Sequence, residues 1–581
     1  MFSLSVCHRS LAAALALSSA LSSAALAGDQ VCGTPPNTAG NNIRYVSYFL
    51  SKPQDAASCS MKVVDGRIVV QAPATNPAMT CADMFSWKLL AEAVKDEFWK
   101  KWAADQETWP GVGCPNGDPK CQATAPLPMC AKGQGGASCC DPNSSTNPGY
   151  DDTRYPAKFC PFFPGDHLSR FASGMPERLG VVPSKAHTVS FAADPGMRAK
   201  LLEETPGRKI RQSMAEIVFR NKPFYDYVFH NDLYHQEGVV EVFRRNAGNI
   251  WHDKASAAPY RVANGSGAIS EIDFPANAVM IKSDWLSRER ALQMGLKDDP
   301  ASPYVKMTIT SAATDNNGTI LEPGEHWLVA IHISSKDIPN WVWTTFEHVG
   351  NPGRCDYTGC NDSYGYASPD KVQPGQATNY TSPHLKCDNL PLPSWVYDTG
   401  RKYDGGAEGA ELAAVLGSLG IGSRDNATLV PAFTDRAWLS YRLKGSQVNF
   451  TDSMGNATHL GNSVTEGGFV SSSSCMTCHA RAGTATNGTL PPALGVFVNE
   501  LTDSGYLPSA HGLPNPDWYH RSGQPPTLNV LQTDFVWGFL TANCTGQTCP
   551  PASAPTTTMK MLQETEEPRP LSSARERSER K

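Results

Sequence analysis

The sequence predicts an α+β protein with a helical N-terminal part, a β-rich middle domain, a mostly α or irregular C-terminal region and disulfide-stapled loops. Three observations support this prediction. Apolar residues recur at helical spacing within 80–104 and 208–245, apolar runs bounded by turn residues follow between 268 and 348, and short mixed segments fill the chain after 405. The 581 residues are enough for about three domains. The 48 Gly and 45 Pro predict long, turn-rich connections.

The first expected helix spans about 80–104. Thr80 or Asp83 can cap it, and Met84, Trp87, Leu90, Val94 and Phe98 follow at helical spacing. We interpret this stripe as a face buried in the core rather than a cofactor site. A second helical region is expected from 208 to 245, interrupted at Pro223.

Four strands are expected in the middle region, over 272–275, 279–281, 305–310 and 327–333. An Asn-Gly turn at 315–318 separates the last two, since Asn-Gly accepts positive φ. The block WVWTTFEH (341–348) comes next and is expected at the edge of the β domain. It could wall a cofactor or substrate pocket, with Glu347 or His348 as a proton donor. Alternatively Trp341 and Trp343 pack inward, and Glu347 and His348 form a local polar contact.

The N-terminus predicts export. Residues 11–27 are almost entirely Ala, Leu and Ser and end in Ala25-Leu26-Ala27, which is typical of a cleaved signal peptide over 1–27, although an N-terminal membrane anchor is the alternative. We find no other apolar run of about 18–20 residues, so no membrane span is expected after cleavage. The expected location is periplasmic or secreted. The net charge of −6 argues against nucleic-acid binding.

Cysteine usage agrees with an oxidising compartment. Of 17 Cys, Cys7 lies in the signal segment and two belong to a motif described below, which leaves 14, enough for up to seven disulfides. These cysteines crowd into 32–160 and into two C-x4-C pairs, at 355/360 and 544/549. Free structural thiols are the alternative, and the pairing cannot be deduced from the sequence.

The expected organisation is a signal peptide (1–27), an α-rich disulfide-containing region (28–265), a β-rich domain (266–400), a C-terminal region (401–550) and a disordered tail (551–581). The C-terminal region contains Cys475-Met476-Thr477-Cys478-His479, which is C-x-x-C-H, the attachment pattern of a covalent c-type haem. On this single motif we expect 401–550 to be a cytochrome c-like haem region. Two thiols about one helical turn apart can add to the two vinyl groups of one haem. The adjacent imidazole can then ligate the iron.

Other readings of the motif fit less well. A disulfide between Cys475 and Cys478 is one, and half of a zinc site is another, but zinc would need further Cys or His at close spacing. A thioredoxin-type pair would follow an apolar strand, whereas here four Ser precede the first Cys. We therefore expect one covalent haem c, held by Cys475 and Cys478, with His479 as the metal ligand.

The second iron ligand stays open at this stage. No Met lies between His479 and Met559, and Met454 precedes the motif. The histidine candidates are His511 and His520 downstream and His332, His348 and His459 upstream. Each of them can equally be an ordinary surface or core histidine. Two His ligands would lower the iron potential relative to Met/His ligation, and an open position would allow oxygen or peroxide chemistry.

Several patches outside the motif resemble a group of large exported bacterial cytochrome c family proteins with a single C-terminal haem motif and no assigned activity. The matching segments are FSWKLLAEAV (85–94), DQETWP (105–110), IDFPANAV (272–279), WVWTTFEH (341–348), AWLSYRLKGSQ (437–447), Leu460-Gly461-Asn462 with Glu466, SSCMTCHARA (473–482) and DFVWGF (534–539). The resemblance implies haem linkage at Cys475 and Cys478 and iron ligation by His479. Rubber oxygenases and bacterial cytochrome c peroxidases carry two such motifs, whereas this chain has one.

The expected function is that of an exported mono-haem c-type cytochrome that transfers electrons. Carriers of this kind need only about 80–120 residues, so the extra length points to a site where the haem meets a substrate or a partner. One alternative is a haem oxygenase or peroxidase-type enzyme with an open distal iron site. Another is an extracellular binding or structural protein with a stabilising haem. The redox partner or small-molecule substrate is not specified by the sequence.

Overall fold

The computed structural model describes residues 55–73, 76–111, 124–152, 155–171, 206–211, 213–249, 268–309, 323–354, 360–367, 407–425, 429–451, 458–467, 473–485 and 527–546, with shorter pieces between them. The fold is mixed α+β, as predicted. The expected signal peptide, the tail, the turn at 315–318 and the candidate ligands Met454 and His511 lie outside the described residues.

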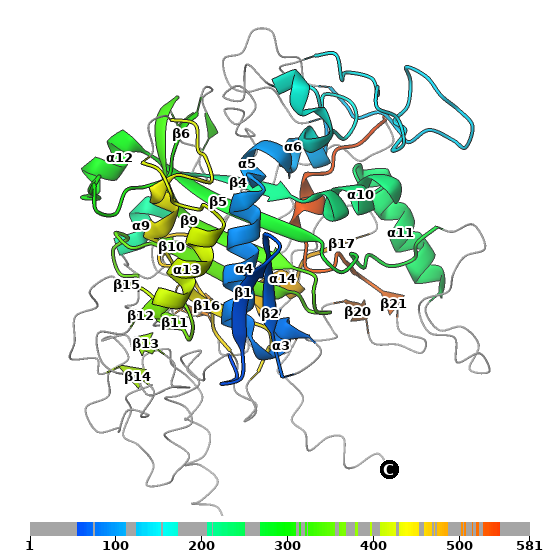
Figure 1. The fold of residues 1–581 in the computed structure, drawn as a ribbon. Coiled ribbons are helices and arrows are strands. Elements are labelled where there is room, and N and C mark those ends of the chain that lie inside the picture. The colour runs from blue at the N-terminus through cyan, green and yellow to red at the C-terminus, as the bar shows by residue number, and fades with distance from the viewer. Residues whose placement is uncertain are drawn as a thin grey trace, which may run out of the picture.

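The centre of the fold is a seven-stranded antiparallel sheet with the order β16-β10-β9-β5-β4-β3, in which β6 also pairs with β9 (Figure 1). Its strands are β3 (Ala103–Ala104), β4 (Met214–Arg220), β5 (Val279–Ser287), β6 (Lys306–Ile309), β9 (Gly324–Ser335), β10 (Val342–His348) and β16 (Tyr441–Gln447). The sheet thus takes strands from each of the three regions expected between residues 28 and 550, namely 28–265, 266–400 and 401–550. The boundaries of those regions stay a prediction.

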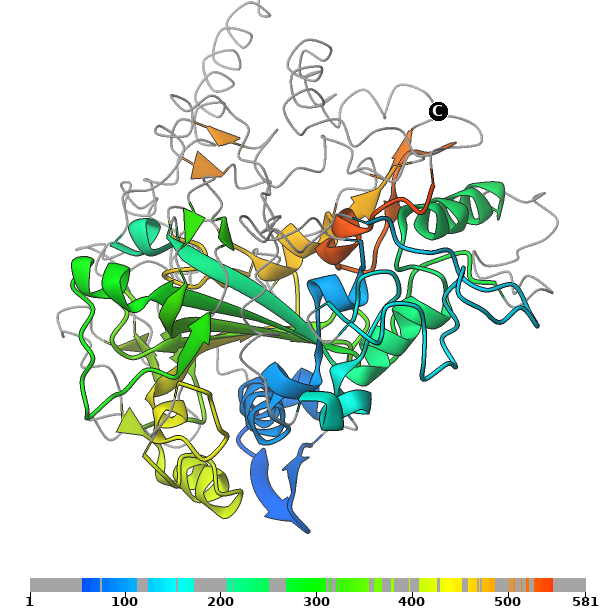
Figure 2. The same ribbon diagram turned by 90° about the horizontal axis from the view of Figure 1, so that it is seen from above.

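The two faces of the sheet differ in chemistry because side chains alternate along each strand. One face carries apolar residues such as Ile281, Ile331, Ile333 and Phe346, which pack with helix α4 (Ala82–Lys95) in the main core. The other face carries polar and aromatic residues and is covered by the C-terminal part of the chain. Figure 2 shows α4 on one side of the sheet and the short helix α14 (Cys475–Ala480) on the other.

Helix α4 begins and ends inside the predicted range of 80–104. Its first turn is capped from outside, because the Asp55 carboxylate accepts hydrogen bonds from the amides of Asp83 (2.8 Å) and Met84 (3.1 Å). It ends before Glu97, whose φ of 52° interrupts the helical backbone. The chain continues as α5 (Phe98–Lys101) and β3, so the last part of the predicted helix is partly strand.

The prediction of a largely helical 208–245 is wrong in its first part. The structure has α9 (Pro206–Arg211), then strand β4, then α10 (Lys222–His230) and α11 (Gln236–Asn249). Pro223 lies in the first turn of α10, where its missing N–H costs nothing, and Asn221 caps that turn by accepting from the Phe224 amide (3.2 Å). The proline therefore helps to begin a helix rather than interrupting one.

Of the predicted strands, 279–281, 305–310 and 327–333 correspond to β5, β6 and β9, whereas 272–275 contains no strand. The Phe274 amide donates instead to the Asp534 carboxylate (2.7 Å), and the Phe274 ring stacks on Phe224 with centroids 4.2 Å apart. This segment is held by side-chain contacts and not by a strand partner.

Smaller elements complete the described fold. They are β1 (Ser60–Val64), β2 (Arg67–Gln71), α3 (Pro77–Thr80), α6 (Asp105–Thr108), α12 (Arg288–Gln293), β7 (Ala313–Thr314), β8 (Ile320–Leu321), β11 (Cys360–Asp362), β12 (Tyr366–Ala367), β13 (Thr378–Tyr380), β14 (Val396–Tyr397), β15 (Ala407–Glu408), α13 (Ala410–Ser418), β17 (Gly483–Thr484), β18 (Leu501–Thr502), β19 (Gly505–Tyr506), β20 (His520–Arg521), β21 (Thr527–Leu528) and β22 (Leu531–Gln532), with 3-10 turns η2 (Pro164–Phe171), η4 (Arg436–Ser440) and η9 (Trp537–Thr541).

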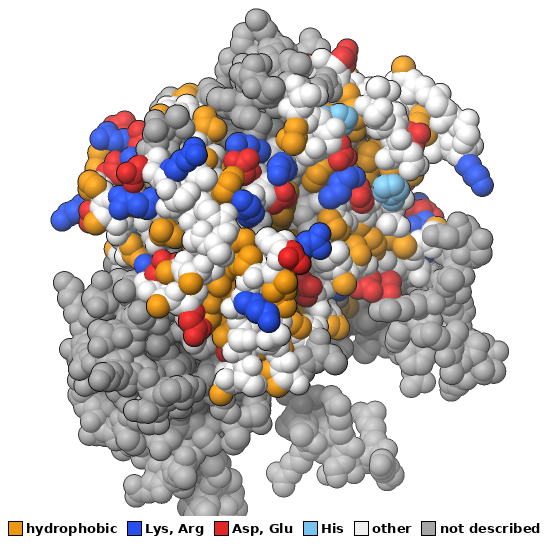
Figure 3. Space-filling model, viewed as in Figure 1, with side chains coloured by type: hydrophobic (Ala, Val, Ile, Leu, Met, Phe, Trp, Pro, Cys, Tyr) orange, Lys and Arg blue, Asp and Glu red, His pale blue; other side chains and the backbone are white. Residues whose placement is uncertain are grey.

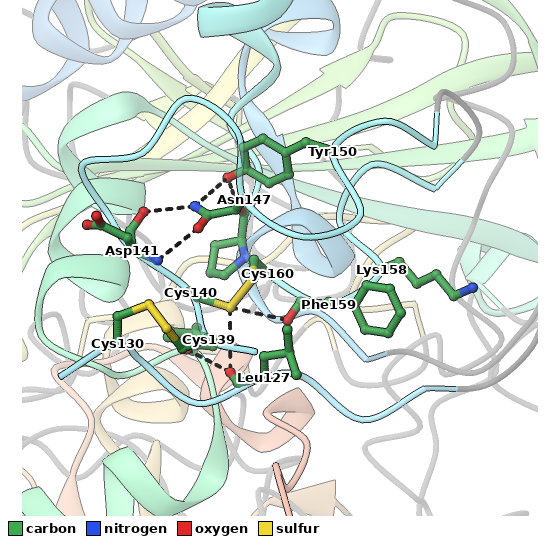
Figure 4. Close-up of a disulfide and its surroundings, with 12 residues drawn as sticks. Leu127, Cys130, Cys139, Cys140, Asp141, Asn147, Tyr150, Lys158, Phe159 and Cys160 are labelled. Atoms are coloured by element: carbon green, nitrogen blue, oxygen red, sulfur yellow. Dashed lines mark hydrogen bonds between the residues drawn. A yellow bond between two sulfur atoms is a disulfide. The ribbon is translucent and has the colours of Figure 1, made fainter. Parts of the chain in front are cut away.

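Disulfides staple the N-terminal third, as predicted. Cys59 pairs with Cys81, Cys130 with Cys139 and Cys140 with Cys160, and the last two tie the loop-rich segment shown in Figure 4. Cys360 and Cys544 are disulfide-bonded as well. Within the described part of the chain, no helix has the length and apolar character needed to cross a bilayer. Acidic and basic side chains are interspersed over the face seen in Figure 3.

Candidate cofactor site

The C-x-x-C-H motif forms helix α14, and the end of strand β16 fastens its first turn. Ser474 is the N-cap and accepts from the Thr477 amide. The Gln447 side chain, at the end of β16, donates to the Ser474 hydroxyl (3.0 Å) and accepts from the Met476 amide (3.1 Å). The free amides at the start of the helix are thus partly satisfied by the neighbouring strand, which fixes the motif against the sheet.

The two motif cysteines lie one helical turn apart, and neither is joined in a disulfide. The alternative of a Cys475–Cys478 disulfide is therefore not what the structure contains. Cys475 is buried with its thiol directed at the Leu460 carbonyl (3.6 Å), and burial raises the pKa of this thiol well above its usual value. Among the described residues there is no cluster of three or more metal-binding side chains, such as a zinc site would need.

The His479 imidazole is oriented by a backbone carbonyl. Its Nδ1 lies 2.9 Å from the Phe535 oxygen, and because a carbonyl can only accept, Nδ1 carries the proton. Burial lowers the pKa of His479 to about 3, so the ring is neutral at ordinary pH. A neutral imidazole protonated at Nδ1 leaves Nε2 as the nitrogen that can bind a metal.

The carbonyl that orients His479 belongs to a strained turn. Asp534 and Phe535 have φ of 46° and 67°, values that non-glycine residues adopt only at a cost. The Asp534 carboxylate anchors this turn by accepting from Lys336 Nζ (2.6 Å), Trp341 Nε1 (3.2 Å) and the Phe274 amide (2.7 Å). Burial raises the pKa of Asp534, and the Lys336 ammonium opposes that effect. We call Lys336, Trp341 and Asp534 the brace of the site.

The ring of His479 lies against the polar face of the sheet. The Trp343 ring of β10 is the closest aromatic contact, with ring centroids 4.3 Å apart, and Trp537 contacts it from the other chain segment at 6.5 Å. Trp343 was one of the residues predicted to wall a pocket. The prediction that its strand lies at the edge of the β domain is wrong, because β16 pairs with β10 on the side away from β9.

Glu347 and His348 do not act together, since successive residues of a strand point to opposite faces. Glu347 is fully buried on the motif side and accepts from the Ser463 amide (2.7 Å), with Lys444 Nζ at 3.3 Å. His348 lies on the other side, with its ring stacked on Tyr304 at a centroid distance of 3.5 Å. The predicted polar contact between Glu347 and His348 is therefore absent, and His348 does not face the motif.

Beside Glu347, the same face carries a group of ionisable residues that the sequence analysis missed as a group. Lys282 lies opposite His332 in the β5–β9 register, and His332 lies opposite Thr345 in the β9–β10 register. Residues 462–466 cover this face, and we call them the covering segment. Their Glu466 places a carboxyl oxygen 3.8 Å from His332 Nε2. The sequence indicated His332 as one of several candidate iron ligands and Glu466 only as part of a resemblance, and it gave no indication of Lys282.

Burial perturbs these groups in different directions. It raises the pKa of Asp284 to about 8 and also that of Glu466, with Lys282 opposing both shifts. It lowers the pKa of His332 well below its usual value, and the charges of Lys282 and Lys444 add to this. Within the described residues, Asp284 Oδ1 and His332 Nε2 are buried atoms without a hydrogen-bond partner. Such atoms favour a polar ligand or metal near them.

The covering segment is itself tightly held. Asn462 is fully buried, and its side-chain NH2 group donates to Thr345 Oγ1 (2.8 Å). Its side-chain oxygen accepts from the backbone amides of Val464 (3.0 Å) and Thr465 (3.2 Å). The Thr465 hydroxyl donates to Asp284. These contacts fix residues 462–466 on the polar face next to the motif.

The structure shows less about the remaining candidates for the second iron ligand. His459 is buried with its pKa lowered to about 4 by burial, opposed by a hydrogen bond with the Ser473 backbone. His520 lies in β20, but its side chain is not among those described. One further candidate emerges from the structure, because Met280 of β5 is buried in the same apolar cluster as Cys475 and Trp343.

The chain was compared with protein-family models, curated proteins and solved structures, and none of them matches it.

Proposed function

We propose that this protein is a mono-haem c-type cytochrome that binds one haem covalently through Cys475 and Cys478, uses His479 as a protein ligand of the iron, and transfers electrons. The observation that carries the proposal is the geometry of the motif. Two thiols outside disulfides lie on adjacent turns of one helix, and the following imidazole has its Nδ1 proton committed to the Phe535 carbonyl. Haem attachment requires the two thiols, and the hydrogen bond at Nδ1 orients the imidazole so that Nε2 can ligate the iron.

Other residues of the chain suit this role. When bound, the haem supplies a one-electron redox couple, and the protein's part is to hold it, orient its ligand and limit water. The brace fixes the turn that orients His479, and Trp343 covers one side of the imidazole. Burial keeps the imidazole neutral, which is the form that ligates iron. The contacts of the brace and of Trp343 involve neither the Cys475 nor the Cys478 side chain.

We also propose that the protein works in the periplasm or outside the cell. The disulfides support this location, since such bonds persist in oxidising compartments. The signal-like N-terminal segment and the resemblance to large exported bacterial cytochrome c family proteins support the same assignment. Covalent attachment has a clear advantage there, because a cofactor linked by two thioethers cannot be lost to the surroundings.

Haem staining after denaturing electrophoresis tests the proposal. The protein is exported through a host with c-type maturation, and covalent haem is expected in the unchanged chain. Cys475→Ala together with Cys478→Ala is expected to remove the stain. The matched control replaces another cysteine pair, Cys130→Ala with Cys139→Ala, which removes a disulfide remote from the motif in sequence and is expected to keep the stain. An unchanged protein that carries no covalent haem contradicts the proposal.

A second candidate function is a haem enzyme with an open iron position, and one observation favours it. Burial raises the pKa of Asp284 to about 8, so this carboxyl can hold a proton at neutral pH on the face next to the motif, and burial raises the pKa of Glu466 as well. An electron carrier has no need of such acids. Binding of carbon monoxide to the reduced protein separates the two functions, since a six-coordinate carrier does not bind it readily and an open site does.

A further inference from the structure

The motif provides one iron ligand, and the sequence leaves the other undecided among several residues. The structure narrows this choice among the three candidate histidines whose side chains it describes, His332, His348 and His459. Of these, His332 of β9 lies on the polar face of the sheet and has an Nε2 atom outside any hydrogen bond. This choice rests on the proposed function, since it concerns the iron that the motif would hold.

The strand register brings His332 close to the motif. Thr345 lies opposite His332 in the β9–β10 pair, and Trp343 lies two residues before Thr345 on the same face. The Trp343 ring contacts the His479 ring at a centroid distance of 4.3 Å. His332 is therefore a diagonal neighbour of the aromatic residue that packs on the motif imidazole, at a spacing within reach of long side chains.

The electrostatics agree with this proximity. Burial is the main cause of the lowered pKa of His332, and the positive charges of Lys282 and Lys444 add to it; protonation of His479 would lower it further, so the two imidazoles are electrostatically coupled. Glu466 and Lys282 in turn influence the pKa of the Cys475 thiol, again after burial. The pairs of residues involved show that the polar face and the motif share one electrostatic environment.

The His332 imidazole is held in a form suited to a metal. Its side chain is 12% exposed, and its Nε2 has no hydrogen-bond partner. The nearest carboxyl oxygen, from Glu466, is 3.8 Å away, which is too far for a hydrogen bond. Burying an unpaired ring nitrogen costs free energy, and a bond to a metal would offset that cost.

The rival ligands fit less well. His348 lies on the opposite face, stacked on Tyr304, with its Nε2 directed at the Ser302 carbonyl (3.1 Å). Met280 lies on the motif side, but its thioether is buried among apolar residues, where it needs no hydrogen-bond partner and its burial costs no free energy of desolvation comparable to that of a ring nitrogen. Burial alone therefore explains Met280, whereas it does not explain the uncommitted nitrogen of His332.

We propose that His332 is the second protein ligand of the haem iron, so that the resting protein is six-coordinate with two histidines. Two histidine ligands predict a low-spin iron with a lower potential than Met/His ligation gives. This assignment favours electron transfer over chemistry at an open iron, and it gives the large β-rich part of the chain a direct role in the redox site.

The experiment compares the unchanged haem-bearing protein with His332→Ala. The unchanged protein is expected to be low-spin, to give near-infrared magnetic circular dichroism typical of two nitrogen ligands, and to bind carbon monoxide poorly. His332→Ala is expected to convert most of the iron to high spin and to bind carbon monoxide readily. Added imidazole is expected to restore the low-spin spectrum, which a merely structural defect would not allow.

Matched variants separate the alternatives. His348→Ala removes another buried β-strand histidine, from the opposite face, and is expected to leave the spectrum unchanged. Sulfur–nitrogen ligation in the unchanged protein that disappears in Met280→Leu overturns the proposal, as does a His332→Ala spectrum identical to the original. If His332→Ala does not fold, His332→Met is compared instead; its dichroism is expected to lose the signature of two nitrogen ligands, and an unchanged spectrum overturns the proposal. A protein without covalent haem contradicts the proposed function, whereas a haem-bearing protein with another ligand contradicts only this inference.

Discussion

Replacing Asp534 with Asn tests whether the brace holds the turn that orients His479. The substitution keeps the shape of the side chain and removes its charge, so Lys336, which is only 8% exposed, loses its closest anionic partner at 2.6 Å. Removing one partner of a buried ion pair costs about 3–5 kcal/mol. The half-exposed Asp273 carboxylate, 3.0 Å from the same ammonium, offsets part of this loss. We therefore expect Asp534→Asn to lower the free energy of unfolding by about 2–4 kcal/mol.

Denaturant unfolding followed by tryptophan fluorescence measures this loss. A second substitution, Lys336→Met in the Asp534→Asn background, removes the lone charge and is expected to recover a substantial part of the stability. Asp298→Asn, which removes one partner of a surface pair with Lys306, serves as the control and is expected to change stability by less than about 0.5 kcal/mol. If Asp534→Asn is as mild as the control, or if the second substitution recovers nothing, the brace does not hold the turn as described.

Three further changes have expected outcomes. Hydrogen bonds with Asp232 and Glu237 outweigh burial and raise the pKa of His235 to about 9, so this proton's stabilisation is complete below about pH 6.5 and is lost as pH rises through 9; a melting temperature that stays flat between pH 7 and 10 contradicts this. Asn462→Ala leaves buried amides without an acceptor and should cost about 2–4 kcal/mol in chemical denaturation. Cys59→Ala with Cys81→Ala opens a crosslink of sequence separation 22 and should cost about 3 kcal/mol, measurable by calorimetry, without affecting haem content.

Local signals predicted the parts of the fold that local physics determines. The apolar run at 327–333 is a buried strand, and the dense cysteines before residue 160 form staples. The helix around Trp87 also formed, because its apolar stripe is long and regular. The order of strands could not be obtained in this way, since β10 finds its partner β16 about a hundred residues later in the chain.

The residues of the candidate site also fall into two groups, those that the local sequence indicates and those that depend on tertiary contacts. Cys475, Cys478 and His479 form a contiguous pattern, so spacing alone indicated them. Asp534 and Lys336 act through a contact between positions 198 residues apart, and although Asp534 begins the DFVWGF segment, nothing in that segment indicates Lys336 as its partner. His332 was one of several unassigned histidines, and only the register of β9 distinguished it from His348. In each case the missing information was tertiary, because a partner's identity depends on which segments the sheet brings together.

The pairing of β10 with β16 has a consequence for the order in which the molecule assembles. As the chain emerges N-terminal end first, strands β3 to β10 are synthesised before residues 441–447. Until then β10 is an edge strand whose outer backbone N–H and C=O groups have no strand partner. Contacts between such distant segments form slowly. The strand that closes this margin also carries Gln447, which grips the start of the motif helix. Completing the sheet and fixing the motif helix are therefore one late event, and a chain that ends before residue 441 would have neither the strand that covers β10 nor the motif itself.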